Sequence, residues 1–204
     1  MTTKTRLVVC GLAGLICLLS VRVHGQVTPQ RLVNATTEPQ NWLTYSGSYW
    51  SQRYSTLDQI TPDNVRNLKL QWVYQSPVAG NWQTTPLVVD GVMYITQRPN
   101  DVVALDPLTG RVFWIYRYTP NENRIVCCGA NNRGVAILGD TLFMGTLDAH
   151  VIAIDAKTGR EVWKTEVATT TSGYSITHAP LVIKDKVIIG VGGGQYGIRG
   201  FIAA

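Results

Sequence analysis

The sequence predicts an all-β protein, an open arc of a β-propeller with four-stranded blades, and one repeated motif carries most of this prediction. The motif reads ALDPLTGRVFW at residues 104–114 and AIDAKTGREVW at residues 153–163, so the copies start 49 positions apart. A third copy begins at residues 201–203, where the same spacing requires it, and the sequence stops one residue later. A period of roughly 40–50 residues is typical of propellers and related repeat arrays. We therefore expect about three blades, the last incomplete.

Each copy of the motif predicts two strands joined by a tight turn. Apolar runs at residues 102–105 and 151–154 precede Asp-x-x-Thr-Gly, and a strand ending in Trp follows. The Asp side chain can cap the turn, and the Gly accepts the positive φ that closes it. Hairpins are expected upstream of each copy, at residues 86–96, 135–145 and 181–191. Four short strands in about fifty residues make one propeller blade.

A generic antiparallel sandwich is the alternative fold, but sandwiches do not repeat a Trp-bearing motif at a fixed spacing. Helical periodicity is absent from the rest of the chain, apart from a short turn expected at residues 61–67. Pro62 would occupy its first helical position.

Residues 1–25 are predicted to be a signal peptide, which implies export to the periplasm. Lys4 and Arg6 form its positive start, residues 7–21 its apolar core and residues 23–25 its exit. The apolar core has about fifteen residues, whereas a membrane span needs roughly twenty. An uncleaved membrane anchor is the alternative, because the exit is an imperfect cleavage site. After the signal peptide we expect an N-terminal segment with the entry strand at residues 26–75, and the first blades at residues 76–204.

The basic character of the whole chain depends partly on this signal peptide. The sequence has 18 Lys and Arg against 13 Asp and Glu. Three of the basic residues and none of the acidic ones lie in residues 1–25, which leaves 15 against 13 and a net charge of about +2. This charge gives no reason to expect a nucleic-acid partner.

Two of the four cysteines remain after cleavage, and they are adjacent. In an oxidising compartment Cys127 and Cys128 are expected to be oxidised. Neighbouring cysteines can pair only through a strained ring, and such strain is usually held at functional sites. Two reduced, buried thiols are the alternative.

The segments around these cysteines resemble the pyrroloquinoline-quinone (PQQ) dependent alcohol dehydrogenases, the methanol/ethanol dehydrogenase family. Cys127-Cys128 followed by Asn-Arg-Gly at 132–134 and the glycine-rich loop 192–200 are the most specific matches. Other matching segments are, in chain order, WLTYSG and QRYS within 42–55, LKLQW at 68–72, TPLVVDGVMY at 85–94 and SITHAP at 175–180. The resemblance extends over residues 40–204 and makes 68–72 the expected strand entering the first blade.

The resemblance implies PQQ, a flat quinone with three carboxylates, held at the propeller axis. A disulfide of Cys127 and Cys128 would lie against one face of PQQ. Arg133 would pair with a carboxylate or the reactive quinone oxygen, for which a planar permanent cation is suited. Thr177 would offer its hydroxyl to a carboxylate. The complete set of implied cofactor-binding residues is Gln83, Cys127, Cys128, Arg133, Thr177, Gly192, Gly193 and Gly194.

Two positions depart from the family pattern. The family usually has a Glu where Gln195 stands, which ligates the Ca²⁺ that polarises the quinone, and another where Gln83 stands, which bonds PQQ. A Gln offers a carbonyl oxygen to a hard cation but no charge. We therefore expect Gln195 to be a weaker metal ligand and Ca²⁺ binding to be reduced.

The implied activity is oxidation of a small primary alcohol to an aldehyde by hydride transfer to the quinone, with electrons passing to a periplasmic cytochrome c. The resemblance places the catalytic Asp, the metal-binding Asn and the Trp on the second PQQ face beyond residue 204. No catalytic residue is therefore expected within this chain. The remaining candidates are expected to be structural residues of strands, turns or loops: Asp101, Asp148, His150 and His178.

Two other functions compete with the enzyme. One is a non-catalytic propeller scaffold of the outer-membrane assembly type, which shares the Trp motif but has no use for vicinal cysteines or Arg133. The other is an inactive truncated product. Because an unclosed arc exposes an apolar blade face around Trp163, we expect the 204 residues to be poorly soluble without a partner such as the missing C-terminal blades.

Overall fold

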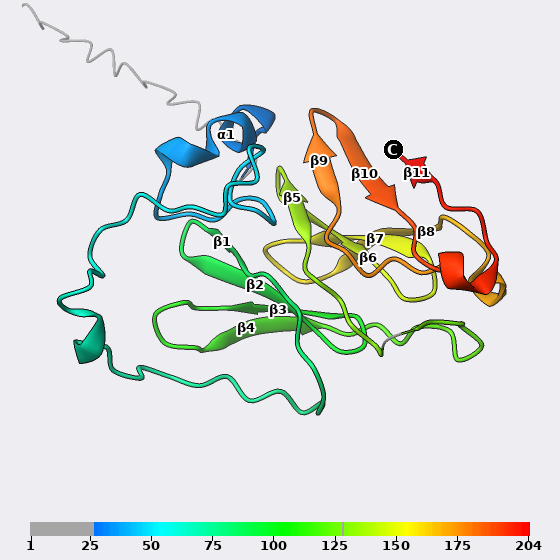
Figure 1. Cartoon of the computed structure of the whole chain (residues 1–204), viewed down its shortest axis with the longest axis horizontal. Coiled ribbons are helices and arrows are strands. Elements are labelled where there is room, and N and C mark those ends of the chain that lie inside the picture. Colours follow the sequence, from blue (N-terminus) through cyan, green and yellow to red (C-terminus); the bar gives the residue numbers. More distant parts are fainter. Residues whose placement is uncertain (1–26, 128) are drawn as a thin grey trace, which may run out of the picture.

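The computed structural model describes residues 27–127 and 129–204; the predicted signal peptide and Cys128 lie outside these residues. Three antiparallel sheets follow one another along the chain and are arranged as an arc (Figure 1). The first contains β1 (Leu87–Val89), β2 (Val92–Gln97), β3 (Asp101–Leu105) and β4 (Val112–Tyr116) in that order. The second contains β5 (Ala136–Leu138), β6 (Thr141–Gly145), β7 (His150–Asp155) and β8 (Glu161–Glu166). The third contains β9 (Leu181–Ile183), β10 (Lys186–Gly190) and β11 (Ile202–Ala203).

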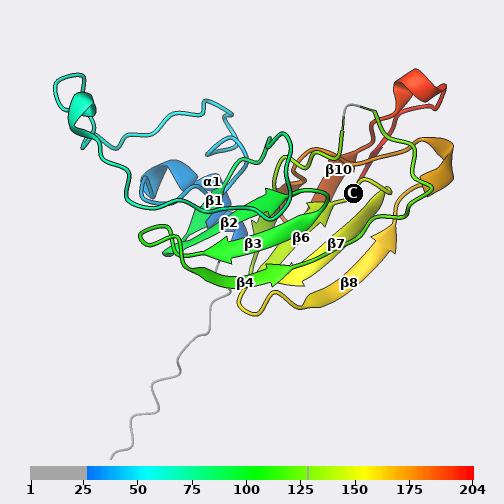
Figure 2. The same cartoon turned by 90° about the horizontal axis from the view of Figure 1, so that it is seen from below.

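These sheets confirm the expected propeller blades. Figure 2 shows the strands of the first two sheets from below, side by side. The last strands of both four-stranded sheets run past their Trp, although they were expected to end there. Their partners explain the extension, because β3 begins early enough to pair Val102 with Tyr116, and β7 pairs His150 with Glu166.

The two Asp-x-x-Thr-Gly turns have the same local structure. The carboxylate of Asp106 accepts the Leu108 N–H and the Thr109 hydroxyl, both at 2.8 Å. Asp155 similarly accepts the N–H and the hydroxyl of Thr158 at 2.8 Å. The closing glycines, Gly110 and Gly159, both have φ of +72°. The predicted turn chemistry is therefore confirmed in both copies.

Each of these glycines supports a tryptophan from an earlier part of the chain. The indole of Trp114 lies on Gly159, so that an added Cβ would come within 2.6 Å of the ring, and its N–H donates to the Ala156 carbonyl. Trp72 repeats this arrangement on Gly110, and its N–H donates to the Pro107 carbonyl at 3.0 Å. This repeated geometry explains why Gly and Trp recur together in the motif. The glycine of each repeat packs against a Trp that precedes it in the chain.

The segment around Trp72 is not the strand expected at residues 68–72. Residues 68–76 have no strand assignment. Exposed and half-buried residues nevertheless alternate from Gln71 to Val78, with Trp72 and Tyr74 packed against the first sheet. This alternation is that of a strand with one covered face, but a strand also requires hydrogen-bonded neighbours. In Figure 1 residues 52–80 form a long loop beside the sheets (cyan to green).

Helical structure is limited to short pieces. Helix α1 (Pro29–Val33) was not expected from the sequence, although Thr28 caps it by accepting the Arg31 N–H and Pro29 fills the first turn. The turn expected at 61–67 is a 3₁₀ helix confined to Val65–Asn67, with Pro62 outside it. Other 3₁₀ helices are Ala35–Thr37, Thr170–Ser172 and Gly194–Tyr196. Within the described residues, no helix has the length and apolar character needed to cross a bilayer.

The N-terminal segment packs against the first two sheets. Leu32 of α1 and Leu43 are buried in the main core with Leu87, Val135 and Ile137. Backbone bridges join Val27 to Gly139 and Trp42 to Val88. Arg31 adds a bidentate ion pair with Asp90 in the β1–β2 turn. These contacts place residues 42–53 beside the first strands of the sheets.

Candidate functional site

Three chain segments that lead into the first strands of the three sheets lie side by side. The N–H of Thr85, just before β1, donates to the carbonyl of Arg133 at 3.0 Å. The N–H of Arg133, just before β5, donates in turn to the carbonyl of Thr177, which precedes β9. Residues more than forty positions apart in sequence are therefore joined by main-chain bonds where the chain enters each of the three sheets.

The side chains of Arg133 and Thr177 meet at this junction. Nη1 of Arg133 donates to the Thr177 hydroxyl at 2.8 Å and lies 3.4 Å from the Thr177 carbonyl oxygen. Both residues are half-buried. Within residues 27–127 and 129–204 the side-chain hydrogen bonds of Arg133 use Nη1 alone. Its other guanidinium nitrogens can therefore donate to an anion placed beside the pair.

Tyr45 and Arg53, two residues not among the predicted cofactor-binding residues, extend this cluster. The Arg53 guanidinium carbon lies 4.7 Å from the centre of the Tyr45 ring. Arg53 lowers the pKa of the Tyr45 phenol against the effect of burial, and a bond to Thr85 and the charge of Arg133 lower it further. Two arginines therefore favour the ionised form of the Tyr45 phenol. Arg53 lies within the QRYS segment that matches the family, so the sequence indicated this position but not its role.

The glycine-rich loop is held next to Thr177. Ser175 and Gly192 form a two-bond backbone bridge, with N···O distances of 3.1 and 2.8 Å. Gly193 has φ of +125°, and a Cβ there would lie 2.0 Å from the Gly173 carbonyl oxygen, so a side chain cannot be accommodated. By contrast, a Cβ at Gly194 would meet no described atom within 4 Å. The close packing thus explains Gly193, and the roles of Gly192 and Gly194 towards a cofactor stay predictions.

Gln83 is exposed two residues before Thr85. It lines a small cavity of about 10 Å³ together with Arg98 and Asn132. A Cβ on Gly80 would lie 1.7 Å from Nη1 of Arg98, so the guanidinium lies directly against that glycine. One on Gly129 would lie 3.8 Å from Nη2. Arg98 is a third cation near the predicted cofactor residues, and sequence analysis missed it because only the fold brings it to Gln83.

The disulfide stays a prediction. Cys127 is exposed and has no disulfide partner among the described residues, and Cys128 lies outside them. The loop that carries both cysteines ends at Asn132, whose side chain is buried. Cys127 therefore lies six residues before Arg133, on a segment whose end is buried.

The described residues do not form a metal centre by themselves. They contain no group of three or more His, Cys, Asp and Glu side chains that could hold a metal ion. Gln195 lies exposed in the 3₁₀ helix Gly194–Tyr196 and could offer one neutral oxygen. A Ca²⁺ ion takes six to eight oxygen ligands. Any metal at Gln195 therefore needs most of its ligands from elsewhere.

The acidic and histidine candidates have structural partners. Asp148 is 1% exposed and accepts hydrogen bonds from Tyr118 and Asn121. Asp101 is buried and accepts from Gln97 and from the Tyr118 N–H. Nδ1 of His150 lies 2.8 Å from the Asp148 carbonyl oxygen. Nε2 of His178 accepts the Gly190 N–H, and burial, aided by the charge of Arg133, lowers the pKa of this imidazole.

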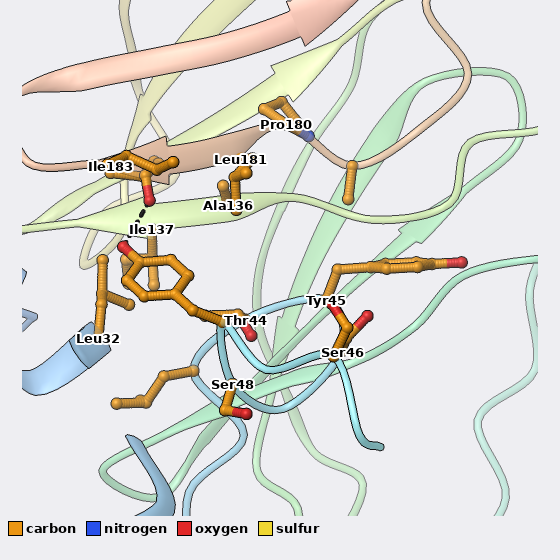
Figure 3. Close-up of a pocket in the computed structure, with 15 residues that line it drawn as sticks. Leu32, Thr44, Tyr45, Ser46, Ser48, Ala136, Ile137, Pro180, Leu181 and Ile183 are labelled. Atoms are coloured by element: carbon orange, nitrogen blue, oxygen red, sulfur yellow. Dashed lines mark hydrogen bonds between the residues drawn. The ribbon is translucent and has the colours of Figure 1, made fainter. Parts of the chain in front are cut away.

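A larger, mostly apolar cavity of about 460 Å³ begins beside the site (Figure 3). Ala136, Leu181 and Ile183 of β5 and β9 line one side, and Thr44 and Tyr45 of the N-terminal segment line the other. The Tyr49 hydroxyl closes one end by donating to the Val182 carbonyl. Of the predicted cofactor-binding residues none lines it, although it starts at Ala179, two residues after Thr177. The cavity adjoins the Arg133–Thr177 pair without containing it.

Comparison with known proteins places these segments in a family. The chain is 44% identical over 167 residues to quinohemoprotein alcohol dehydrogenase ADH IIB of Pseudomonas putida, covering 80% of this chain and 24% of that protein. It is also 44% identical over 166 residues to 1-butanol dehydrogenase (cytochrome c) of Thauera butanivorans, again covering 80% and 24%. The solved structure of quinohemoprotein alcohol dehydrogenase ADHIIG from Pseudomonas putida HK5 superimposes with a TM-score of 0.84 at 40% identity. It covers 88% of this chain and 27% of that one.

The chain spans about a quarter of the length of these relatives. The model of the glucose/ethanol/alcohol dehydrogenase β-propeller domain with PQQ matches residues 42–196, well over half of the chain. The match includes Gln83, the cysteine segment, the Arg133–Thr177 pair and Gln195. The chain therefore belongs to the PQQ-dependent alcohol dehydrogenases, a family of β-propeller oxidoreductases.

Proposed function

We propose that this chain forms one wall of the cofactor site in a quinoprotein dehydrogenase that oxidises small primary alcohols to aldehydes with PQQ. The observation that carries the proposal is the Arg133–Thr177 pair, with Nη1 2.8 Å from the hydroxyl. The pair lies within the family match and joins the segments that lead into the second and third sheets.

The residues present fit an anionic, planar cofactor. Arg133 has donors without a partner among the described residues, beside a hydroxyl, and this combination suits a carboxylate. Arg53 and Arg98 add positive charge nearby, and Tyr45 lies between Arg53 and the Thr85 segment. When bound, PQQ would supply the two-electron oxidant for the alcohol. The chain itself would orient the cofactor through Arg133 and Thr177 and cover one face with the segment that carries Cys127.

We infer that the complete enzyme is exported and passes its electrons to a periplasmic cytochrome c. The predicted signal peptide supports export, and a similar protein is named as a cytochrome c-linked 1-butanol dehydrogenase. Because this chain spans a quarter of its relatives, the general base and the second wall of the site are assigned to the further blades of the propeller.

The cofactor role of Arg133 is tested by PQQ titration of the full-length protein, followed by fluorescence, with dye-linked oxidation of ethanol and 1-butanol as a second measurement. Arg133→Gln should weaken PQQ binding by about tenfold to a hundredfold, because a hydrogen bond to a charged group contributes roughly 1.5–3 kcal/mol. Arg133→Lys should recover only part of the affinity, since an ammonium cannot bind a carboxylate through two parallel bonds.

Arg111→Gln is the matched control, because Arg111 stacks on Phe113 at the exposed edge of the first sheet. Its PQQ affinity should equal that of the parent. Equal affinity for parent and Arg133→Gln would refute the role of Arg133. A full-length protein that binds no PQQ would overturn the proposed function.

The metal prediction concerns Gln195. We propose that the metal of the full-length enzyme is held more weakly than in relatives with a Glu at this position, because a neutral amide oxygen replaces a carboxylate. Gln195→Glu should tighten Ca²⁺ binding by about tenfold in a calcium titration followed by calorimetry. Gln52→Glu provides a control in which a charge is added on another exposed loop residue. Binding by Gln195→Glu no tighter than by the parent would contradict the prediction.

A further inference from the structure

The segment that carries the cysteines has no helix or strand at residues 117–127 and 129–135. It runs from the end of β4 at Tyr116 to the start of β5 at Ala136. Cys127 lies in its exposed middle part. A connection of this length is held in one conformation only by bonds from its surroundings. Residues 145–149 provide them; they are the last residue of β6 and the turn that leads to β7, together called the 145–149 turn below.

The side chain of Asp148 holds the first half of this segment. One carboxylate oxygen, Oδ2, accepts the Tyr118 hydroxyl at 2.9 Å and the Asn121 N–H at 2.8 Å. The other, Oδ1, accepts the hydroxyl of Thr146 within the same turn. Asp148 is 1% exposed, so its charge is compensated by these donors rather than by water. A segment that leaves the first sheet is thus fixed to the second sheet.

The same turn also holds the other end of the segment. The Asn132 side chain, next to Arg133, donates to the Gly145 carbonyl at 2.8 Å. Asn100 from the β2–β3 turn donates to the same oxygen and accepts the Leu147 N–H at 3.0 Å. Both ends of the cysteine segment are therefore anchored within five residues of each other on the 145–149 turn.

The following connection, which leads to Thr177, is attached to the 145–149 turn as well. The Thr170 hydroxyl donates to the Asp148 carbonyl at 2.9 Å. The N–H groups of Val167 and Ile176 donate to the carbonyls of Ala149 and Thr146, also at 2.9 Å. The turn thus lies between the two connections that carry Cys127, Arg133 and Thr177, and Asp148 contacts both.

We propose that Asp148 is a positioning residue, which fixes the cysteine segment relative to Arg133 and Thr177 by accepting the Tyr118 and Asn121 donors. A carboxylate suits the task because each of its oxygens only accepts, whereas an amide would turn an NH₂ group towards one of the donors. The significance of this for PQQ rests on the proposed function. The placement of the segment does not.

The first experiment follows hydrogen–deuterium exchange by mass spectrometry in the full-length apo protein. Asp148→Asn should accelerate exchange in peptides covering 117–127 by about tenfold or more, because the Asn121 N–H loses its charged acceptor. Tyr118→Phe should give a smaller increase in the same peptides, and it removes one hydroxyl without placing a new polar group in the core. Peptides from β1–β3 and β5–β7 should change by less than about twofold.

Asp140→Asn is the control, since Asp140 bonds the exposed Lys157 on the opposite turn of the same sheet. Its exchange pattern should match the parent. If Tyr118→Phe accelerates exchange equally throughout the protein, the bond to Asp148 stabilises the whole fold and not this segment in particular, and the proposal is overturned. Unchanged exchange at 117–127 in both variants would also overturn it.

A second measurement separates this inference from the proposed function. In Tyr118→Phe the faster exchange at 117–127 should appear with or without PQQ binding by the parent. If the parent binds PQQ, Tyr118→Phe should also weaken PQQ binding, by about threefold or more. A loosened segment with unchanged PQQ affinity would overturn the link between Asp148 and the cofactor. Failure of the parent to bind PQQ would remove the proposed function and leave the exchange result as the deciding evidence.

Discussion

Trp114 and Trp163 occupy the same position in two successive repeats, yet their surroundings differ. Trp114 is half-buried, lies on Gly159 and donates its indole N–H to Ala156. Trp163 is 42% exposed, and within the described residues its ring contact is with Phe143 of its own sheet, 5.9 Å between centres. The difference shows that the Trp of one repeat is buried by packing on the Asp-x-x-Thr-Gly turn of the next repeat. The motif therefore forms a contact between blades as well as a turn within one blade.

Trp72 supports this interpretation from the other side. It docks on Gly110 as Trp114 docks on Gly159, although it belongs to no assigned strand. The docking contact therefore does not require a complete sheet behind the tryptophan. It requires the turn that receives it.

The largest expected effect comes from removing the two tryptophans separately. Trp114→Ala should lower the free energy of unfolding by about 3 kcal/mol, because it removes a large packed ring and one of the two donors to the Ala156 carbonyl, the other being the Tyr94 hydroxyl. Trp163→Ala should cost about 1 kcal/mol or less, since much of its ring is already exposed. Urea unfolding followed by circular dichroism measures both. Equal losses would contradict the idea that docking, rather than the Trp itself, provides the stability.

Gly159→Ala tests the receiving side of the contact and should cost about 2 kcal/mol. Its φ is positive, and the new Cβ would lie 2.6 Å from the Trp114 ring. Gly91→Ala is the matched control, since Gly91 also has positive φ, +81°, but no described atom lies within 4 Å of an added Cβ. The control should cost only about 1 kcal/mol, the penalty for a left-handed alanine. If the two variants unfold at the same urea concentration, the contact with Trp114 contributes nothing beyond backbone strain.

The same contrast explains how much of the fold could be predicted from the sequence. The Asp-x-x-Thr-Gly turns are local, so Asp106 and Asp155 revealed them directly. The prediction of a strand at 68–72 was wrong, because strand formation depends on hydrogen-bonded partners that the local sequence does not specify. Helix α1 was missed because five residues are too few to show periodicity, although its cap and proline were visible.

The candidate site was predictable only where a family motif supplied it. Arg133 and Thr177 were named from the resemblance, and the structure brings them within 2.8 Å. Arg98 could not be found in this way, because its proximity to Gln83 arises from the packing of separate segments. Tyr45 and Arg53 lie in the matching segments WLTYSG and QRYS, but the resemblance gave them no role. Asp148 was correctly expected in a turn, but its bonds to Tyr118 and Asn121 depend on the neighbouring connection.

The smallest expected effect concerns the turns between the second and third strands, where the first repeat has the neutral Asn100 and the second has Asp148. Burial raises the pKa of Asp148, but the bonds from Thr146, Asn121 and Tyr118 outweigh it, so the pKa lies below its usual value. A carboxylate with a lowered folded pKa contributes stability above its unfolded pKa of about 4 and loses it as the pH falls through the folded value.

The free energy of unfolding of the parent should therefore fall between pH 6 and pH 2.5. In Asp148→Asn it should fall less, by on the order of 1 kcal/mol, a typical contribution of such bonds. The charge of His150, whose Nδ1 lies 3.5 Å from Oδ1, also lowers the pKa of Asp148. Asn100→Asp supplies the converse variant, because it places a carboxylate in the turn of the first repeat. It should destabilise the protein at pH 7, where the Asn100 side chain now donates to Gly145, and partly recover at low pH. Parallel pH profiles for the parent and Asp148→Asn would show that the charge of Asp148 does not distinguish the two turns.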